Sequence, residues 1–289
     1  MNTTKTLFIS DLDGTLLNRN AEISQYTRDS LNRMIADGLY FSVATGRTSA
    51  TALKILESIK WHIPIVLLNG VLIYNVVQKQ YMQVLSLSDI TVRSIVSMMK
   101  DLNITGLMYQ LKKNEQVTYY ETLEHTPLFD FIEERKIRYN KVFHKVSFAD
   151  VPPEDIIYFT LLDKYDKIKL THEAFSKIPD ICLSVYKDIY SQDLWYLEIH
   201  NDKATKQNGT AYLRNAFGFD RVIGFGDNLN DLPMFAACDV RVAVENAASE
   251  VKAAADYICD TNDNDGVVKW ILENYGKQSG TNHSNSHYV

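Results

Sequence analysis

Several features that would point to other classes of protein are scarce in this sequence of 289 residues. It has three cysteines, Cys182, Cys238 and Cys259, which lie far apart and form no CxxC pair, so a disulfide framework or a cysteine-rich metal site is not expected. The formal net charge is −6, which argues against a nucleic-acid surface, because such a surface needs a clustered basic face. The longest apolar stretch is broken at Asn69, far short of a membrane span.

The first residues also lack the apolar core of a signal peptide. Together with the sparse, odd set of cysteines, this favours a cytoplasmic protein with reduced thiols. We therefore expect neither a nucleic-acid nor a membrane partner. The length is sufficient for one large domain or two ordinary ones with a substantial core.

What the sequence does contain is a pair of aspartates after the apolar run Leu7–Ile9. Asp11 and Asp13 are two residues apart, and side chains on an extended backbone alternate with a period of two, so both carboxylates point to one small site. Gly14 and Thr15 then allow a sharp turn. Two close carboxylates are unfavourable unless a cation lies between them or they divide the roles of nucleophile and proton donor. Phosphoryl transfer through an aspartate nucleophile with Mg²⁺ meets both conditions.

Two further apolar segments end in polar residues of the same kind. One leads into Thr45 and Gly46, whose hydroxyl and free backbone N–H groups at a helix start suit a phosphate dianion. The alternative is that Thr45 only caps the helix. The other segment, Arg221–Gly226, is followed by Asp227 and by Asp231 in the string GDNLND, a combination that is rare by chance.

These segments, in this order, resemble motifs I, II and IV of the haloacid dehalogenase superfamily. The string Leu68-Asn69-Gly70 and two strings near the end, VAVENA and DNDGV, are similar to its Cof-type branch, subclass IIB. The resemblance covers the chain from Lys5 to about Tyr275. It implies a phosphatase of phosphoric monoesters that forms an aspartyl-phosphate intermediate.

Motif III of the family is a lysine ahead of a helix, and this chain offers both Lys203 and Lys206. The spacing from the strand that contains Glu198 favours Lys206. A glycine commonly follows the motif III lysine, and here Gln207 stands in that place, which leaves Lys203 as the alternative.

Carried over residue by residue, the resemblance implies a role for each matching position. Asp11 is the nucleophile, and Asp13 protonates the leaving alcohol and then deprotonates the attacking water. Mg²⁺ is the cofactor, held by the carboxylates of Asp11 and Asp227 and by the backbone carbonyl of Asp13. Asp231 acts from outside the metal's ligands, where it orients a water or the lysine.

The remaining site residues are expected to bind the substrate. Thr45, Gly46 and Lys206 hold the phosphoryl oxygens. A further three line the mouth of the site, where they reach the phosphate or the leaving group: Arg47, Asn69 and Asn230.

Apolar strands and amphipathic helices alternate at both ends of the chain, which predicts a parallel sheet with right-handed crossovers, an α/β Rossmann-like core. The expected strands are Leu7–Ser10, Tyr40–Ala44, Ile65–Leu68, Val222–Gly226, Val242–Val244 and Tyr257–Cys259. The expected helices are Gln25–Ala36, Ser49–Ile59, Leu232–Ala237, Ser249–Ala254 and Val267–Asn274. The motif residues fall at the carboxyl ends of strands, where such sheets bind ligands.

The middle of the chain breaks this rhythm and predicts an inserted α+β domain, which resembles the type 2 cap of the superfamily. We therefore expect core residues 1–84, a cap at 85–190, core residues 191–275 and a disordered tail at 276–289. Expected cap strands are Thr105–Tyr109, Ile156–Leu162 and Ile181–Tyr186, with helices at Asp89–Lys100 and Lys164–Ser176. Several tyrosines fall in or beside the cap, and we expect most of them to pack its sheet: Tyr109, Tyr119, Tyr120, Tyr158, Tyr186 and Tyr190.

The expected function is Mg²⁺-dependent hydrolysis of small phosphate monoesters, sugar phosphates or related phosphorylated metabolites, by a monomer or weak homo-oligomer. Two alternatives remain open. A phosphomutase of the same superfamily would return the phosphoryl group to a second hydroxyl. A phospho-accepting regulatory module would keep the acyl phosphate without turnover.

Overall fold

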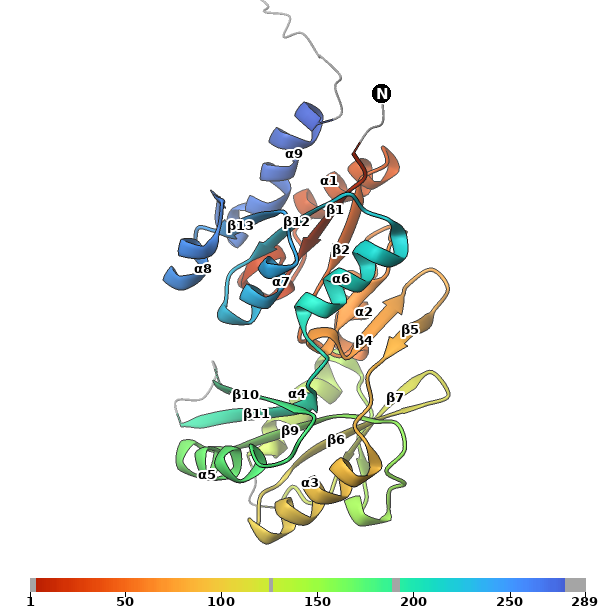
Figure 1. The fold of residues 1–289 in the computed structure, drawn as a ribbon, viewed down its shortest axis with the longest axis vertical. Coiled ribbons are helices and arrows are strands. Elements are labelled where there is room, and N and C mark those ends of the chain that lie inside the picture. Colours follow the sequence, from red (N-terminus) through yellow and green to blue (C-terminus); the bar gives the residue numbers. More distant parts are fainter. Residues whose placement is uncertain (1–3, 125–126, 189–192, 279–289) are drawn as a thin grey trace, which may run out of the picture.

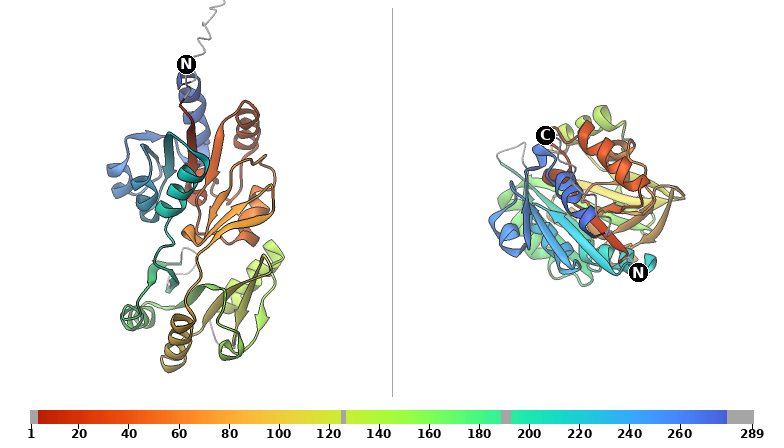
Figure 2. Two further views of the ribbon diagram at one scale, coloured as in Figure 1. Left: turned by 45° about the vertical axis from the view of Figure 1, so that its right-hand side comes forward. Right: turned by 90° about the horizontal axis from the view of Figure 1, so that it is seen from above.

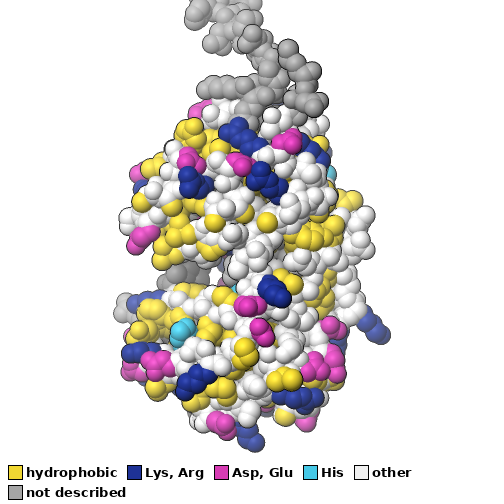
Figure 3. Space-filling model, viewed as in Figure 1, with side chains coloured by type: hydrophobic (Ala, Val, Ile, Leu, Met, Phe, Trp, Pro, Cys, Tyr) yellow, Lys and Arg dark blue, Asp and Glu magenta, His cyan; other side chains and the backbone are white. Residues whose placement is uncertain are grey.

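The computed structural model describes residues 4–124, 127–188 and 193–278. The chain forms a core domain, which contains both ends of the described chain, and a cap domain inserted between the two halves of the core (Figure 1). A hollow separates the two domains on one side of the molecule (Figure 3).

The core is built from elements at both ends of the chain. They are β1 (Thr6–Ser10), α1 (Gln25–Ala36), β2 (Tyr40–Val43), α2 (Ser49–Leu56), α6 (Lys206–Phe217), β12 (Arg221–Gly226), α7 (Leu232–Ala236), β13 (Val240–Val244), α8 (Ser249–Ala254), β14 (Tyr257–Cys259) and α9 (Gly266–Gln278). The strands form one sheet in the order β14-β13-β12-β1-β2, and every neighbouring pair is parallel.

Helices cover both faces of this sheet. Helix α6 contacts α7 on one face, and α1 contacts α9 on the other (Figures 1 and 2). A parallel sheet covered in this way buries both faces of its strands, so the central strands are nearly continuous apolar runs such as Leu7-Phe8-Ile9. The predicted Rossmann-like core is confirmed.

Three short strands form a separate sheet beside the core, in the order β3 (Ile65–Leu67), β4 (Leu72–Asn75) and β5 (Gln80–Val84). The sequence predicts β3 as a member of the parallel sheet, and this is only partly right. An isolated parallel bridge joins Ala44 to Val66, but the strand's ladder is antiparallel, with β4. The hairpin of β4 and β5 is not predicted from the sequence.

The cap has its own sheet and helices. Its elements are α3 (Asp89–Asp101), β6 (Gly106–Lys112), β7 (Glu115–Tyr120), α4 (Leu128–Tyr139), β8 (His144–Lys145), β9 (Ile156–Lys164), α5 (Tyr165–Phe175), β10 (Ile181–Lys187) and β11 (Leu194–Asn201). The sheet order is β10-β11-β9-β6-β7-β8, with antiparallel pairing except between β7 and β8. The predicted α+β cap is therefore present.

The two faces of the cap sheet have different partners. Helices α3 and α5 contact each other and enclose a second apolar cluster that includes Ile95, Phe159 and Phe175. Helix α4 belongs to the other side, where Leu128 and Ile132 join the apolar cluster of the core and α4 contacts α2. The cap is thus packed against the core through α4.

The predicted end of the cap at residue 190 is wrong. Strand β11 pairs with β9 and β10 over its whole length, so the cap sheet runs on to Asn201. The two crossings between the domains lie side by side, because the Asn201 side chain donates a hydrogen bond to the carbonyl of Ser86 at 2.9 Å. An apolar strand does not reveal in its own sequence which of two sheets it joins, and here the cap sheet takes it.

Two other predictions concern residues at or beyond the ends of the described segments. Helix α9 extends to Gln278, so the segment predicted as a disordered tail begins with three helical residues. Residues 279–289 and Tyr190 lie outside the described residues. The three cysteines are free thiols, as expected.

Candidate active site

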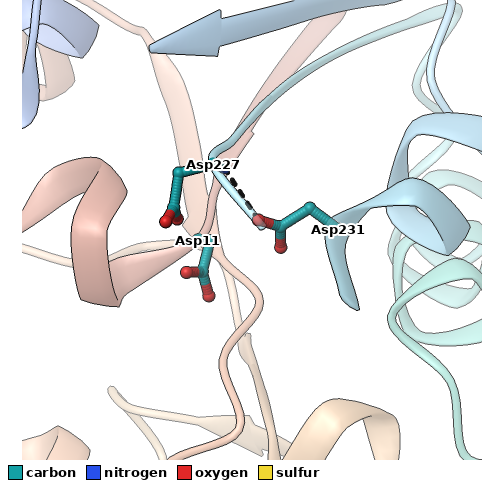
Figure 4. Close-up of side chains that lie close together, drawn as sticks. All are labelled: Asp11, Asp227 and Asp231. Atoms are coloured by element: carbon teal, nitrogen blue, oxygen red, sulfur yellow. Dashed lines mark hydrogen bonds between the residues drawn. The ribbon is translucent and has the colours of Figure 1, made fainter. Parts of the chain in front are cut away.

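The predicted motif residues meet where β1, β2 and β12 end. Asp11 directly follows β1, and its backbone N–H donates to the carbonyl of Phe225 on β12 at 2.9 Å. Asp227 directly follows β12, and Asp231 lies one turn further on (Figure 4). Carboxyl ends of neighbouring parallel strands meet at one edge of a sheet, so residues far apart in sequence come together there.

Three of the carboxylates form a compact group. Asp11, Asp227 and Asp231 each offer one oxygen, and these oxygens lie within 4.8 Å of one another (Figure 4). Lys206 lies among them, with Nζ at 2.5 Å from Asp11 Oδ1 and 2.7 Å from Asp231 Oδ1. One ammonium group therefore faces three carboxylates.

Helix α6 begins in a way that directs Lys206 into this group. The Thr205 hydroxyl accepts a hydrogen bond from the backbone N–H of Asn208 at 3.0 Å, and this N-cap makes Lys206 the first residue of the helix. Lys206 is only 2% exposed. Lys203 is exposed, and its side chain forms no contact with the three aspartates.

Asp231 differs from the other two aspartates in its hydrogen bonds. Its Oδ2 accepts from the backbone N–H groups of Asp227 at 2.9 Å and Asn228 at 3.1 Å, and its Oδ1 accepts from Lys206. Both of its oxygens are therefore occupied. In contrast, Oδ2 of Asp11 and Oδ2 of Asp227 accept no hydrogen bond from any described residue, while Asp227 Oδ1 accepts from the Thr15 hydroxyl at 2.6 Å.

The electrostatics of the group reflect this excess of negative charge. Burial, Asp231 and Asp227 raise the pKa of Asp11 well above its ordinary value, although Lys206 opposes them. Burial also raises the pKa of Asp227 to about 6. The pKa of Lys206 is raised despite the opposing effect of burial, because Asp11 and Asp231 stabilise the ammonium. A divalent cation held by the free oxygens of Asp11 and Asp227 would compensate this charge, and carboxylate oxygens suit Mg²⁺.

Asp13 lies toward the mouth of the site, with its side chain 52% exposed. Arg47 binds it in a bidentate way, with Nε at 2.7 Å from Oδ2 and Nη2 at 2.6 Å from Oδ1. The third nitrogen, Arg47 Nη1, donates to the hydroxyl of Tyr139 on α4 at 3.2 Å. The guanidinium therefore connects a core carboxylate to the cap.

The segment after β2 places a second set of polar groups beside the first. The Thr45 hydroxyl accepts from the backbone N–H of Arg47 at 3.1 Å, so Thr45 does cap this turn locally. The backbone N–H of Asn69 donates to the carbonyl of Thr45 at 2.9 Å, which brings Asn69 next to Gly46. Asn69 Oδ1 is buried and has no hydrogen-bond partner among the described residues. Asn230 is exposed and contacts none of these groups.

Two further residues shape the turn after β1, and only Gly14 has a role there that is predicted from the sequence. Gly14 has φ +80°, and a Cβ there would lie 2.4 Å from Asp227 Oδ2. The side chain of Asn246 donates to the carbonyl of Gly14 at 2.8 Å and so fixes this turn. The only sequence signal for Asn246 is its position after the apolar strand in the string VAVENA.

Comparison with known proteins agrees with this geometry. A family model described as haloacid dehalogenase-like hydrolase matches residues 8–271. The chain belongs to this family. The match includes the cap, most of the core and all of the site residues named above.

Individual relatives cover nearly the whole chain. The 5-amino-6-(5-phospho-D-ribitylamino)uracil phosphatase YcsE of Bacillus subtilis is 28% identical over 285 residues, which cover 92% of this chain and 96% of that protein. The pyridoxal phosphate phosphatase YbhA of Escherichia coli is 23% identical and covers 90% of this chain and 95% of its own. This haloacid dehalogenase-like hydrolase is therefore of the phosphatase type, and the substrates named are those of its relatives.

Solved structures share the complete fold. The crystal structure of TM0651 from Thermotoga maritima is 26% identical, has a TM-score of 0.76 and covers 92% of this chain and 96% of its own. The subclass IIB sugar phosphatase BT4131 is 23% identical, with a TM-score of 0.70 and coverage of 93% and 98%, and it shows the same fold. Among the described residues of this hydrolase, no helix is long and apolar enough to span a membrane.

Proposed function

We propose that this chain is a Mg²⁺-dependent phosphatase that hydrolyses small phosphate monoesters through an aspartyl-phosphate on Asp11. The observation that carries the proposal is a pair of carboxylate oxygens, on Asp11 and Asp227 beside the buried Lys206, that accept no hydrogen bond from any described residue. Bound there, Mg²⁺ would neutralise charge on the phosphoryl oxygens. Asp231 is the positioning residue, because it holds Lys206 and the backbone of the Asp227 turn.

The reaction then divides between two aspartates. A carboxylate oxygen of Asp11 attacks phosphorus in line, forming the P–O bond of an acyl phosphate as the bond to the leaving oxygen breaks. Asp13 gives its proton to that oxygen. In the second step Asp13 takes a proton from water, which attacks phosphorus and releases inorganic phosphate and free Asp11.

Fixed donors stabilise the phosphoryl group during both steps. Lys206 and the Thr45–Gly46 turn contribute positive charge and hydrogen-bond donors at fixed positions, which is the main source of rate enhancement in phosphoryl transfer. The substrate phosphate also competes with Asp13 for the Arg47 guanidinium. We infer that substrate binding releases Asp13 from Arg47, so that Asp13 can exchange protons.

The position of the cap supports small substrates. The cap lies over the strand ends and reaches Arg47 through Tyr139, so the leaving group has to fit between core and cap. YcsE and YbhA are both named for small phosphorylated compounds. We propose sugar phosphates and related metabolites as the substrate class, with the enzyme acting in the cytoplasm as a monomer or weak oligomer.

The covalent step can be tested with p-nitrophenyl phosphate, whose leaving group needs no protonation. In Asp13→Asn, attack by water is impaired, so we expect a burst of nitrophenol stoichiometric with enzyme and then slow turnover. Asp11→Asn should show no burst. A stoichiometric burst from Asp11→Asn would assign the nucleophile elsewhere.

The metal and the product are tested separately. Activity should be lost in excess chelator and return with Mg²⁺, and Ca²⁺ should inhibit, because it takes more ligands at longer distances and disturbs the in-line geometry. Full activity in chelator would overturn the role of Mg²⁺. Free phosphate as the product identifies a hydrolase, whereas an isomeric sugar phosphate would identify the phosphomutase.

A further inference from the structure

A second cavity lies at the junction of the two domains, and the catalytic aspartates do not line it. Its volume is about 520 Å³. The core contributes Ser49 and Leu53 of α2 and Tyr81 of β5, and the cap contributes Gln116, Tyr139 and Lys141. We call this space the junction cavity. Half of its fourteen lining residues are aromatic or apolar and half are polar, and two of the polar side chains carry a donor group without an acceptor among the described residues.

Lys141 is the first of these groups. The residue is 7% exposed, yet no described residue accepts a hydrogen bond from its Nζ or forms an ion pair with it. Its neighbours are the ring faces of Tyr109, with the centroid at 4.8 Å, and Phe143, at 5.1 Å. Burial and the nearby Arg135 lower the pKa of Lys141 to about 7. A buried amine in such a place lacks the anion that normally compensates it.

Gln116 is the second group. Its Oε1 accepts from the Ser49 hydroxyl at 3.0 Å, and that hydroxyl oxygen accepts in turn from the Tyr81 hydroxyl at 3.0 Å. This chain of hydrogen bonds fixes the orientation of the amide. Gln116 Nε2 is buried and has no acceptor among the described residues. No water-sized group can reach this nitrogen, so the fixed amide of Gln116 shapes the cavity wall, and Lys141 is the donor that a ligand in the cavity can reach.

We propose that the junction cavity binds a small oxyanion, a carboxylate or a phosphoryl group, through Lys141. The aromatic and apolar walls favour an anion attached to a flat or apolar body. Glu115, which carries a negative charge on the cavity wall, is exposed and forms no ion pair with Lys141. The cavity has walls from both domains, so its ligand would favour the arrangement of core and cap in which both walls are in place.

Two probes distinguish the sources of the oxyanion, benzoate for a carboxylate and methylphosphonate for a phosphoryl group. Their affinities are measured by calorimetry with the full chain in metal-free buffer, and neither probe has a phosphate ester to hydrolyse. We expect at least one to bind the wild type in the millimolar range, and Lys141→Met to weaken that binding about tenfold or more. Gln116→Leu should weaken it to a smaller degree.

Lys169→Met is the matched control, because Lys169 is an exposed lysine on α5 and does not line the cavity. It should leave the affinity unchanged. The proposal is overturned if neither probe binds the wild type up to about 10 mM, or if Lys141→Met binds as tightly as the wild type. These measurements do not use phosphatase activity. Their outcome therefore does not depend on whether the proposed reaction is correct.

A second measurement needs no variant. Lysines of the wild type are acetylated with a low concentration of acetic anhydride, and the rate at each lysine is followed by peptide mass spectrometry. A saturating probe should slow acetylation of Lys141 several-fold and leave Lys169 unchanged. Equal rates at Lys141 with and without the probe would contradict its position at the binding site.

Discussion

At the scale of single residues, Lys206 is the group on which the buried charge of the site depends. Its removal would leave Asp11 and Asp231 without their shared cation. Breaking a buried ion pair from one side costs about 3–5 kcal/mol, because the remaining charge is buried and uncompensated. Under the proposed function, stability and catalysis would depend on the same side chain.

We expect Lys206→Met to lower the free energy of unfolding by several kcal/mol and kcat by a factor of about 10³ or more. Lys203→Met should change stability by less than about 0.5 kcal/mol and leave kcat unchanged, since Lys203 is exposed. Urea unfolding and steady-state kinetics measure the two quantities. Comparable losses in both variants would show that the choice between the two lysines is wrong.

Lys141 predicts a pH dependence of stability. Its pKa is about 7 in the folded chain and about 10.4 in an unfolded one, so unfolding takes up a proton between these values. Stability then rises with pH across this window, by on the order of 1 kcal/mol per pH unit from this residue. The cost of burying Lys141 is greatest below pH 7.

The measurement is the difference in unfolding free energy between wild type and Lys141→Met from pH 7.5 to 9.5. This difference should shift in favour of the wild type as the pH rises. Lys169→Met should show no such trend. A difference that does not change with pH would mean that Lys141 keeps its ordinary pKa in the folded protein.

At the scale of elements, turns and helix ends decide where the charged groups lie. The turn after β1 brings Gly14 against Asp227, and Asn246 holds it there. The N-cap of α6 directs Lys206 inward. In both cases a short local motif places a side chain that the sequence identifies only by type.

Gly14→Ala tests the turn. The residue has φ +80°, and the added Cβ would lie 2.4 Å from Asp227 Oδ2, so the variant combines backbone strain with displacement of a proposed metal ligand. We expect activity to fall about 100-fold or more and the affinity for Mg²⁺ to weaken.

Gly218→Ala is the matched control. Gly218 ends α6 at φ +63°, and a Cβ there meets nothing within 4 Å. It should cost about 1–2 kcal/mol of stability from the left-handed backbone alone, with activity unchanged. If Gly14→Ala loses no more activity than Gly218→Ala, the close approach to Asp227 is unimportant.

At the scale of the whole molecule, the cap limits what can reach Asp11. The two domains are joined by adjacent crossings at Ser86 and Asn201, and α4 packs against α2 and contacts Arg47. A substrate has to enter between these surfaces. In the proposed reaction, the size of the leaving group would therefore be selected by the cap rather than by the proposed phosphate site.

We expect kcat/KM for small sugar phosphates to exceed that for a phosphopeptide by about 100-fold or more. Replacement of residues 86–201 by a short linker should reduce turnover of sugar phosphates far more than that of p-nitrophenyl phosphate. Circular dichroism checks that the core remains folded. Equal losses on the two substrates would show that the cap does not select the substrate.

Local patterns in the sequence were sufficient to predict most strands and helices of the core and the types of residue in the candidate site. Apolar runs that end in polar strings identify β1, β12 and the residues Asp11 and Asp227, since these signals need only neighbouring residues. Amphipathic periodicity predicts α1 and α8 at their observed bounds. The choice of Lys206 over Lys203 also agrees with the position of Lys206 in the structure, although its role in catalysis is a prediction.

Tertiary structure decided what depends on contacts between distant segments. Strand β11 joins the cap sheet and β3 pairs with a hairpin, because hydrogen bonds of a strand edge can be satisfied by either of two sheets and the side-chain pattern is the same in both. The bidentate contact of Arg47 with Asp13 joins two segments that are far apart in the sequence, and Lys141 and Gln116 line a cavity where the cap meets the core. The burial of a side chain and the charges around it depend on contacts between distant segments, so one stretch of sequence cannot specify them.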